Sequence, residues 1–181
     1  MLSKSPNTGF ISNNVYTIQN SSKHLENLKS RIPWQRYKNS KRLVCSLGVS
    51  YSYSGHTTIG HSFDLYPPLK KLINSINSIL GTNYNSALLN WYPANTKCGI
   101  NAHSDNEPEI VKGSSVLSIS LGASIDFYLT SHDGKEQIKV QLNDSDIFLM
   151  GDNCQLYYKH HIPYYIMTSD RISITLREFI I

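Results

Sequence analysis

Apolar residues recur at helical spacing in two stretches of the first half of the chain. Residues 22–32 carry one apolar stripe, which Pro33 would end. Residues 67–80 follow a period of 3.6 residues, with proline at the start and Gly81 directly after the end. The pattern predicts a short helix and a longer one. The twenty residues at the start are polar and rich in Asn and Ser, and we expect a loosely attached arm there.

The remaining pattern has the period of two that is typical of β-strands. One strand and turn are predicted at 43–55, and 55–66 is predicted to be a loop. After residue 83, eight short extended runs alternate with turn residues. They are Ala87–Tyr92, Ile100–His103, Ser115–Leu121, Ile125–Thr130, Glu136–Leu142, Asp146–Met150, Gln155–His160 and Arg171–Phe179. Eight strands predict a mainly β fold, a double-sheet jelly roll, with the N-terminal helices covering one sheet.

Length and composition narrow the class of protein. A chain of 181 residues fits one domain with its own core. It has no apolar run long enough for a membrane span and no secretory signal at its start, so we expect a soluble, cytoplasmic protein that is monomeric. The three cysteines are scattered, which favours buried, reduced thiols over disulfides or a thiolate zinc site.

Positive charge is concentrated near the N-terminus. Residues 1–43 contain eight basic residues against Glu26 alone, although the net charge of the whole chain is only +4. The eight are Lys4, Lys23, Lys29, Arg31, Arg36, Lys38, Lys41 and Arg42. Such a basic edge favours a polyanion as partner, and aromatic residues between the cations, Trp34 and Tyr37, can stack on bases. A solvated surface without a partner is the other interpretation.

A candidate metal site lies at His103-Ser104-Asp105. Residues two apart in an extended segment project from the same face, so the imidazole and the carboxylate can reach one ion. His160 or His161 can supply a third ligand, and two His with one carboxylate is the ligand set of non-haem Fe(II) oxygenases. The motif alone is weak evidence, because short His-x-Asp pairs also arise by chance.

The last predicted strand alternates strictly. Ile172, Ile174 and Leu176 fall on one face, and Arg171 and Arg177 fall on the other. In an interior strand of a jelly roll, arginines on the inward face need anionic partners. A small dicarboxylate would suit them, since guanidinium groups bind carboxylates through two parallel hydrogen bonds. The simpler alternative is a half-exposed strand whose arginine face is exposed to solvent.

Seven segments, taken in order, resemble the AlkB family of Fe(II)/2-oxoglutarate dioxygenases, which remove alkyl groups from nucleic acid bases. The segments are Trp34-Gln35, Tyr51–Gly55, Leu89–Tyr92, His103–Pro108, Ser118–Gly122, Tyr158–Pro163 and Arg171–Arg177. Their joint order is more specific than any one of them. The resemblance covers about residues 34–178, so we predict an N-terminal extension at 1–33 and an AlkB-like domain at 34–181.

The resemblance implies cofactors, a reaction and roles for particular residues. The cofactors are Fe(II) and 2-oxoglutarate, with O2 as co-substrate, and the partner is methylated RNA or single-stranded DNA. The reaction is oxidative demethylation, which releases formaldehyde, succinate and CO2. The implied iron ligands are His103, Asp105 and His160, and the implied 2-oxoglutarate contacts are Asn90, Tyr92, Arg171, Ser173 and Arg177. The implied substrate contacts are Trp34, Tyr51, Tyr53, Asn106 and Glu107.

Two positions depart from the family pattern. Ser173 stands where many members carry Asn, and Asn106 stands where several carry an acidic residue that contacts the methylated base. The second departure leaves the choice of base open, because an uncharged amide favours a cationic methylated ring less. Two other functions also remain open: a 2-oxoglutarate-dependent hydroxylase of a protein or small molecule, and a non-catalytic jelly roll that binds nucleic acid.

Overall fold

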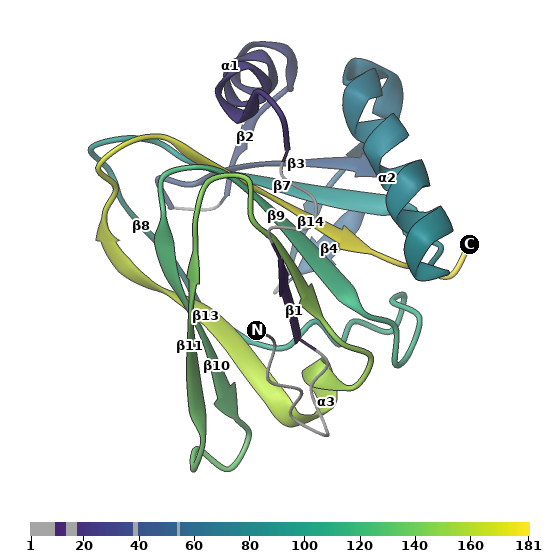
Figure 1. Ribbon diagram of the computed structural model, residues 1–181, viewed down its shortest axis with the longest axis vertical. Coiled ribbons are helices and arrows are strands. Elements are labelled where there is room, and N and C mark those ends of the chain that lie inside the picture. The colour runs from purple at the N-terminus through teal and green to yellow at the C-terminus, as the bar shows by residue number, and fades with distance from the viewer. Residues whose placement is uncertain (1–9, 14–17, 38–39, 54) are drawn as a thin grey trace.

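Two largely antiparallel β-sheets face each other in the computed structural model, which describes residues 10–13, 18–37, 40–53 and 55–181 (Figure 1). The larger sheet has the order β1-β12-β9-β14-β7-β3-β2, with β6 beside β3, and the smaller has the order β11-β10-β13-β8. The strands of the larger sheet are β1 (Phe10–Asn13), β2 (Gln35–Arg36), β3 (Leu43–Gly48), β6 (Gly60–His61), β7 (Ser86–Tyr92), β9 (Val116–Gly122), β12 (Ile147–Met150) and β14 (Arg171–Arg177). Those of the smaller are β8 (Lys97–His103), β10 (Ile125–Ser131), β11 (Gln137–Leu142) and β13 (Tyr158–Ile166). The expected jelly roll is confirmed.

The two helices lie on the outer face of the larger sheet, as Figure 1 shows. Both α1 (Ser21–Arg31) and α2 (Pro67–Leu80) contribute to one apolar core with β14, in which Ile172 and Ile174 pack with Leu28 and Ile73. The predicted long helix has the bounds that its sequence pattern gives, and Gly81 ends it at φ 66°, a left-handed conformation that glycine adopts without strain.

A second apolar core fills the space between the sheets. It includes Phe127, Leu129, Phe148 and Ile162. Arg171, Ser173 and Arg177 of β14 face this interior and are buried, as the alternation in the sequence predicted. Apolar side chains between the sheets therefore surround a small number of charged groups.

The strand register brings several candidate site residues directly opposite each other. In the β7–β14 pair, Tyr92 is opposite Arg171 and Asn90 is opposite Ser173. In the β8–β13 pair, His103 is opposite His160. Directly opposite residues have Cβ atoms about 5 Å apart, so these side chains share a small volume although they lie far apart in the sequence.

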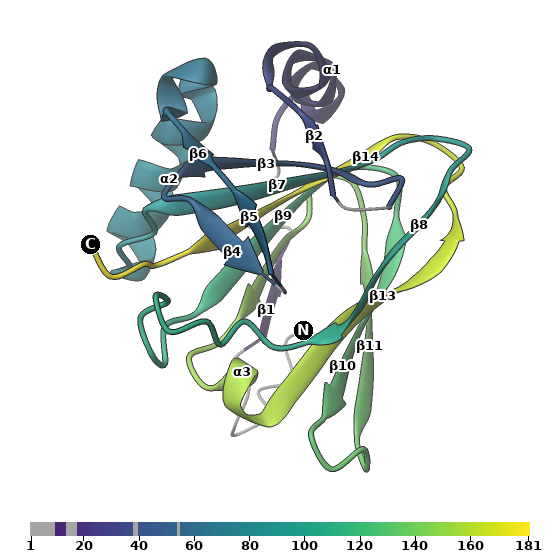
Figure 2. The same cartoon turned by 180° about the vertical axis from the view of Figure 1, so that it is seen from behind.

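The single strand expected at 43–53 is wrong. The chain turns after β3 at Gly48, whose φ is 84° and where an added Cβ would lie 2.1 Å from the carbonyl oxygen of Asn85. It then forms β4 (Tyr51–Tyr53), which pairs with β5 (His56–Thr58) as a hairpin, and a 3₁₀ turn at Phe63–Leu65 follows β6. The hairpin extends towards the space between the two sheets (Figure 2). The segment 55–66 is thus not a simple loop.

The strand expected at Gln155–His160 is displaced. Residues Cys154–Tyr157 form the short helix α3, and β13 continues through Pro163 to Ile166. Strand β10 pairs with β13 only as far as His161, so proline at 163 interrupts no ladder on that side. The pairing with β8 shifts register around the same point.

The expected N-terminal arm contributes a strand to the larger sheet. Residues Phe10–Asn13 form β1 and pair with β12, while residues 1–9 and 14–17 lie outside the described part of the chain. The three cysteines are free and buried, as expected. Among the described residues, no helix combines the length and apolar character that a membrane span needs.

Candidate metal and cofactor site

His103, Asp105 and His160 come together between the sheets. One nitrogen or oxygen atom from each lies within 4.8 Å of the others. The Nε2 atom of His103 is 3.7 Å from Oδ1 of Asp105, and the Nε2 atom of His160 is 4.0 Å from Oδ2. Metal–ligand bonds of about 2.0–2.2 Å can bridge gaps of this size. Two imidazoles and one carboxylate therefore fit one divalent ion, with positions left open for other ligands.

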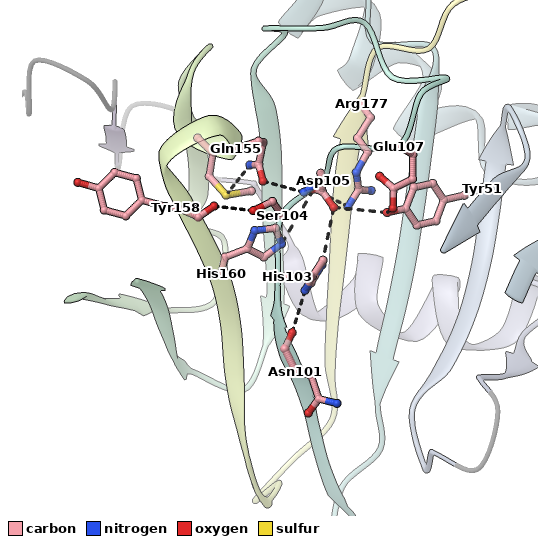
Figure 3. A network of polar contacts seen from close by, with 11 residues as sticks. Tyr51, Asn101, His103, Ser104, Asp105, Glu107, Gln155, Tyr158, His160 and Arg177 are labelled. Carbon is pink, nitrogen blue, oxygen red and sulfur yellow. Dashed lines mark hydrogen bonds and ion pairs between the residues drawn. The ribbon is translucent and has the colours of Figure 1, made fainter. Parts of the chain in front are cut away.

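Hydrogen bonds to the backbone hold the His-x-Asp segment in place. His103 ends β8, and Asp105 lies two residues beyond it rather than within the strand. The Ser104 hydroxyl donates to the Tyr158 carbonyl at 2.8 Å, and the Asp105 backbone N–H donates to Oε1 of Gln155 at 2.9 Å (Figure 3). The contacts tie the segment to α3 and to β13, the strand that carries His160. The two histidines are thereby kept in register.

A further hydrogen bond sets the tautomer of His103. Its Nδ1–H donates to the Asn101 carbonyl at 2.8 Å, which leaves Nε2 with a lone pair facing Asp105. The Nε2 atom of His160 also faces Asp105, and the His160 ring stacks on Phe127 with 5.6 Å between centroids. Each imidazole thus presents one nitrogen to the carboxylate.

The pKa values favour the ligand forms of all three groups. Burial lowers the pKa of His160 to about 3, and it also lowers the pKa of His103, where Arg177 and Arg42 add to the effect. Burial acts to raise the pKa of Asp105, but the charges of Arg177 and the two histidines outweigh it and hold the value at about 2. Neutral imidazoles and an ionised carboxylate are the forms that bind a cation.

The two arginines of β14 have different surroundings. Arg177 donates from its NH2 to Oδ2 of Asp105 at 2.8 Å, whereas Arg171 donates from its NH2 to the Ser120 hydroxyl at 3.0 Å. Burial lowers the pKa of Arg171, while the Asp105 carboxylate overcomes burial and raises that of Arg177. Arg171 is thus a fully buried cation without a carboxylate among the described residues.

Unpaired polar atoms mark out the candidate 2-oxoglutarate site. Nε and NH1 of Arg171, the Tyr92 hydroxyl and Oδ1 of Asn90 are buried and lack hydrogen-bond partners among the described residues. Buried polar groups are rarely left unpaired in folded proteins, so these atoms call for a polar ligand. A carboxylate fits the donors of Arg171 and Tyr92. The donor set fits 2-oxoglutarate, and Ser173, opposite Asn90, lies on the same wall.

The expected substrate residues near the metal cluster are Tyr51, Asn106 and Glu107. Tyr51 is buried, and its hydroxyl donates to Oε1 of Glu107 at 3.0 Å. Its ring lies under the Arg177 guanidinium, 4.7 Å from centroid to Cζ. Burial raises the pKa of Glu107, and the Asp105 charge adds to this. Asn106 is exposed. Glu107 lies beside Tyr51 (Figure 3), and its buried Oε2 atom is unpaired among the described residues.

Trp34 occupies a different face of the protein. Its indole N–H donates to the Leu28 carbonyl at 3.2 Å, and its ring packs on Trp91 with 5.6 Å between centroids. Both tryptophans belong to the core beneath α1, on the far side of the larger sheet from the metal cluster. This position does not support the expected substrate contact. Tyr53 lies in β4, but its side chain is outside the described part of the structure.

The described basic residues of the N-terminal region are not all free at the surface. Lys29 is engaged with Asp170 and Glu26, and Arg42 is buried in the pocket between the sheets. Lys23, Arg31, Arg36 and Lys41 are exposed, while Lys4 and Lys38 lie outside the described residues. The expected polyanion surface is thus reduced to four described cations.

Sequence analysis did not single out Gln155, Asp170 or a pocket role for Arg42. The first two act through hydrogen bonds between distant segments, which no local motif reveals. Arg42 does carry a signal, because it alternates with Val44 and Ser46 and so falls on the inner face.

Comparisons with known proteins agree with this geometry. Residues 11–177 match the model of the 2OG-Fe(II) oxygenase superfamily. The chain is 29% identical over 132 residues to an RNA replication protein of Grapevine virus A (isolate Is 151), covering 71% of this chain and 7% of that protein. It is 23% identical over 156 residues to the DNA oxidative demethylase ALKBH2 of Bos taurus, covering 81% and 55%. A solved structure titled "The structure of OsALKBH1" superposes with a TM-score of 0.64 at 16% identity, covering 94% and 98%.

The chain belongs to the 2OG-Fe(II) oxygenase superfamily and, within it, to the AlkB family. Fe(II) and 2-oxoglutarate are the cofactors of this family, which confirms the expected cofactors. The chain spans little more than half of the bovine relative and a small part of the viral one.

Proposed function

We propose that this protein oxidatively demethylates N-methylated bases in RNA or single-stranded DNA. The arrangement of His103, Asp105 and His160 beside buried arginines supports the proposal most directly. It combines a ligand set for Fe(II) with a cationic pocket for a dicarboxylate, and the two lie next to each other. The bovine relative is named as a DNA oxidative demethylase.

Each residue group has a separate task in the proposed reaction. His103, Asp105 and His160 hold Fe(II), Arg171 and Tyr92 hold the far carboxylate of 2-oxoglutarate, and Arg177 orients Asp105. The bound cofactors, with O2, supply the oxidising power that hydroxylates an N-methyl carbon, while 2-oxoglutarate leaves as succinate and CO2. The resulting N-hydroxymethyl group breaks its C–N bond to release formaldehyde and the unmodified base.

Glu107 is the residue that we assign to the methylated base. Its unpaired Oε2 can accept a hydrogen bond from an exocyclic amine, and its Oε1 is fixed by Tyr51. A carboxylate here also suits the positive charge of 1-methyladenine and 3-methylcytosine. Glu107 thereby supplies the acidic group that is missing at Asn106.

The similarity to part of a viral RNA replication protein favours RNA over DNA. The test offers RNA and single-stranded DNA oligonucleotides of one sequence, each with a single 1-methyladenine or 3-methylcytosine, to protein loaded with Fe(II) and 2-oxoglutarate. We expect equal amounts of formaldehyde and restored base, measured by mass spectrometry, with faster turnover on RNA. His103→Ala and Asp105→Ala variants control for contaminating activity. Turnover of 2-oxoglutarate that removes no methyl group from any substrate would contradict the proposal.

A further inference from the structure

Arg42 is a buried cation in the pocket between the sheets. The proposed cofactors supply no counter-charge for it. Only 7% of its surface is exposed, and its side chain lines the same pocket as His103 and Arg171. Its Nε atom has no hydrogen-bond partner, and no carboxylate forms an ion pair with it among the described residues. Buried polar atoms are rarely left unpaired in folded proteins, so the Nε atom of this guanidinium calls for a ligand, and a cation favours an anionic one.

The strand register locates Arg42 relative to the cofactor site. Leu43 pairs with Trp91, so Arg42 falls beside Tyr92, which pairs with Arg171 on its other side. Arg42 and Arg171 therefore flank Tyr92 in one row of the inner face, about 10 Å apart at the backbone. Each of the two cations can therefore face an anionic group of its own.

The Tyr37 ring defines the environment of Arg42. The Arg42 guanidinium carbon lies 4.5 Å from the centroid of this ring, and the Tyr37 backbone N–H donates to the Arg42 carbonyl at 3.2 Å. The Arg42 backbone N–H donates in turn to the Ser40 hydroxyl at 3.0 Å. The turn before β3 is thus fixed, and the guanidinium keeps donors for a ligand while one of its faces is covered.

The charges in the pocket favour an oxyanion of the substrate as the ligand of Arg42. Arg177 already binds Asp105, and Arg171 has the donors for the far carboxylate of 2-oxoglutarate. Fe(II) and 2-oxoglutarate together add no net charge. With both cofactors bound, Arg42 still lacks an anion, and a nucleic acid brings one phosphate for each nucleotide.

We propose that Arg42, stacked on Tyr37, binds the backbone phosphate next to the methylated base. This inference rests on the proposed function and adds a specific phosphate contact to it. The contact carries no base information but fixes the register of the strand, so that one base is presented to the metal. A guanidinium suits this role, because its planar fork matches phosphate geometry.

The test measures how binding depends on salt. Wild type, Arg42→Gln and the control Lys71→Gln, which removes an exposed charge on α2, are loaded anaerobically with Mn(II) and 2-oxoglutarate. The probe is a short single-stranded RNA with one 1-methyladenine. Loss of one phosphate contact lowers the slope of log K against log salt by about 0.7. We expect this decrease for Arg42→Gln and no change for Lys71→Gln. An unchanged slope in Arg42→Gln would overturn the inference.

Neutral methylphosphonate linkages identify the phosphate without depending on a variant that folds. Replacing one linkage at a time in the wild-type complex should lower the slope by about 0.7 at the linkage beside the methylated base. The same replacement should have no effect in Arg42→Gln. If no single linkage beside the base differs from the distant ones, the phosphate subsite is wrong.

Two further measurements separate the possible anions and the two proposals. The Kd for 2-oxoglutarate should be equal in wild type and Arg42→Gln; a weaker cofactor affinity with an unchanged salt slope would assign Arg42 to a cofactor carboxylate and overturn the inference. The salt slopes are repeated with an unmethylated RNA of the same sequence. If Arg42→Gln lowers that slope while no methylated base is ever demethylated, the phosphate site holds and the proposed function fails.

Discussion

The Arg177 guanidinium donates to the Asp105 carboxylate, with 2.8 Å between NH2 and Oδ2. The resemblance to AlkB proteins implied only a cofactor contact for this arginine, whereas the structure also connects it to a candidate iron ligand. The pair is fully buried, so each charge depends on the other. Arg177 bonds Oδ2, the oxygen that also faces Nε2 of His160, while Oδ1 faces Nε2 of His103. Arg177 therefore acts on the metal site as well as on the cofactor site.

Replacing Arg177 should weaken metal binding, while replacing Arg171 should not. In Arg177→Met the Asp105 carboxylate loses its arginine partner, and we expect the affinity for Fe(II) without 2-oxoglutarate to fall by about 10–100-fold. Arg171→Met is the matched control: it removes a buried guanidinium that contacts Ser120 rather than Asp105, so only the 2-oxoglutarate affinity should fall. Anaerobic titration with Fe(II), followed by 2-oxoglutarate, measures both constants. Equal Fe(II) affinities in the two variants would refute the positioning role.

Asp170 should control the binding of 2-oxoglutarate through its neighbour Arg171. Its Oδ1 accepts hydrogen bonds from the Trp91 indole at 3.1 Å and the Ala94 N–H at 2.9 Å, and its Oδ2 lies 2.7 Å from Lys29 Nζ. These contacts fix the start of β14. In Asp170→Ala we expect a higher KM for 2-oxoglutarate, while kcat at saturating cofactor is retained.

Lys29→Met separates this positioning effect from general loss of stability. It removes the ion pair with Asp170 but leaves the hydrogen bonds from Trp91 and Ala94 in place. A partly exposed ion pair contributes at most about 1 kcal/mol, so the KM should stay near the wild-type value. Asp170 does not position Arg171 for 2-oxoglutarate if both variants raise the KM equally, or if Asp170→Ala lowers kcat alone.

Much of the fold could be predicted because its periodicities are local. The helix at Pro67–Leu80 and the strict alternation of Arg171–Arg177 each follow from residues that are close in sequence. The break after Gly48 could not be predicted in this way. It depends on contact with the carbonyl of Asn85, 37 positions away in the sequence, and a strand pattern does not record that contact.

The candidate site shows the same division. The three candidate metal ligands could be named because their residue types are rare in a β-sheet interior and their order matches a family pattern. Gln155 could not, since an amide that accepts from the Asp105 backbone has no distinctive spacing. Trp34 shows the opposite case: an aromatic residue beside cations resembles a stacking surface, whereas its ring packs under helix α1.

Trp34 should therefore matter for stability rather than for substrate binding. Trp34→Ala removes the hydrogen bond to the Leu28 carbonyl and the contact with Trp91, and we expect a loss of about 3 kcal/mol in the free energy of unfolding. The KM for a methylated oligonucleotide should be unchanged at a temperature where the variant is folded. Urea unfolding measures the loss of stability, and steady-state kinetics measure the KM. A raised KM in a stably folded variant would show that Trp34 does contact the substrate.

The metal-free protein should lose stability as the pH falls, because of His160. Burial holds the pKa of this residue at about 3 in the folded state, against 6.5 for an unperturbed histidine. Between these values the unfolded chain binds a proton that the folded protein does not, so the free energy of unfolding decreases as pH falls. This contribution is fully present above pH 6.5 and is lost progressively towards pH 3, at up to about 1.4 kcal/mol per pH unit.

His160→Gln should make this pH profile less steep, because the variant loses one imidazole that is protonated in the unfolded chain but not in the folded protein, while His103, whose pKa burial also lowers, keeps its own contribution. The matched control is His132→Gln, which changes an exposed histidine next to the β10–β11 turn and should keep the wild-type slope. Urea unfolding midpoints between about pH 4 and pH 8, in the presence of a chelator, measure the profile. If His160→Gln kept the wild-type dependence of stability on pH, protonation of another buried group would cause the acid sensitivity. The assignment to His160 would then be wrong.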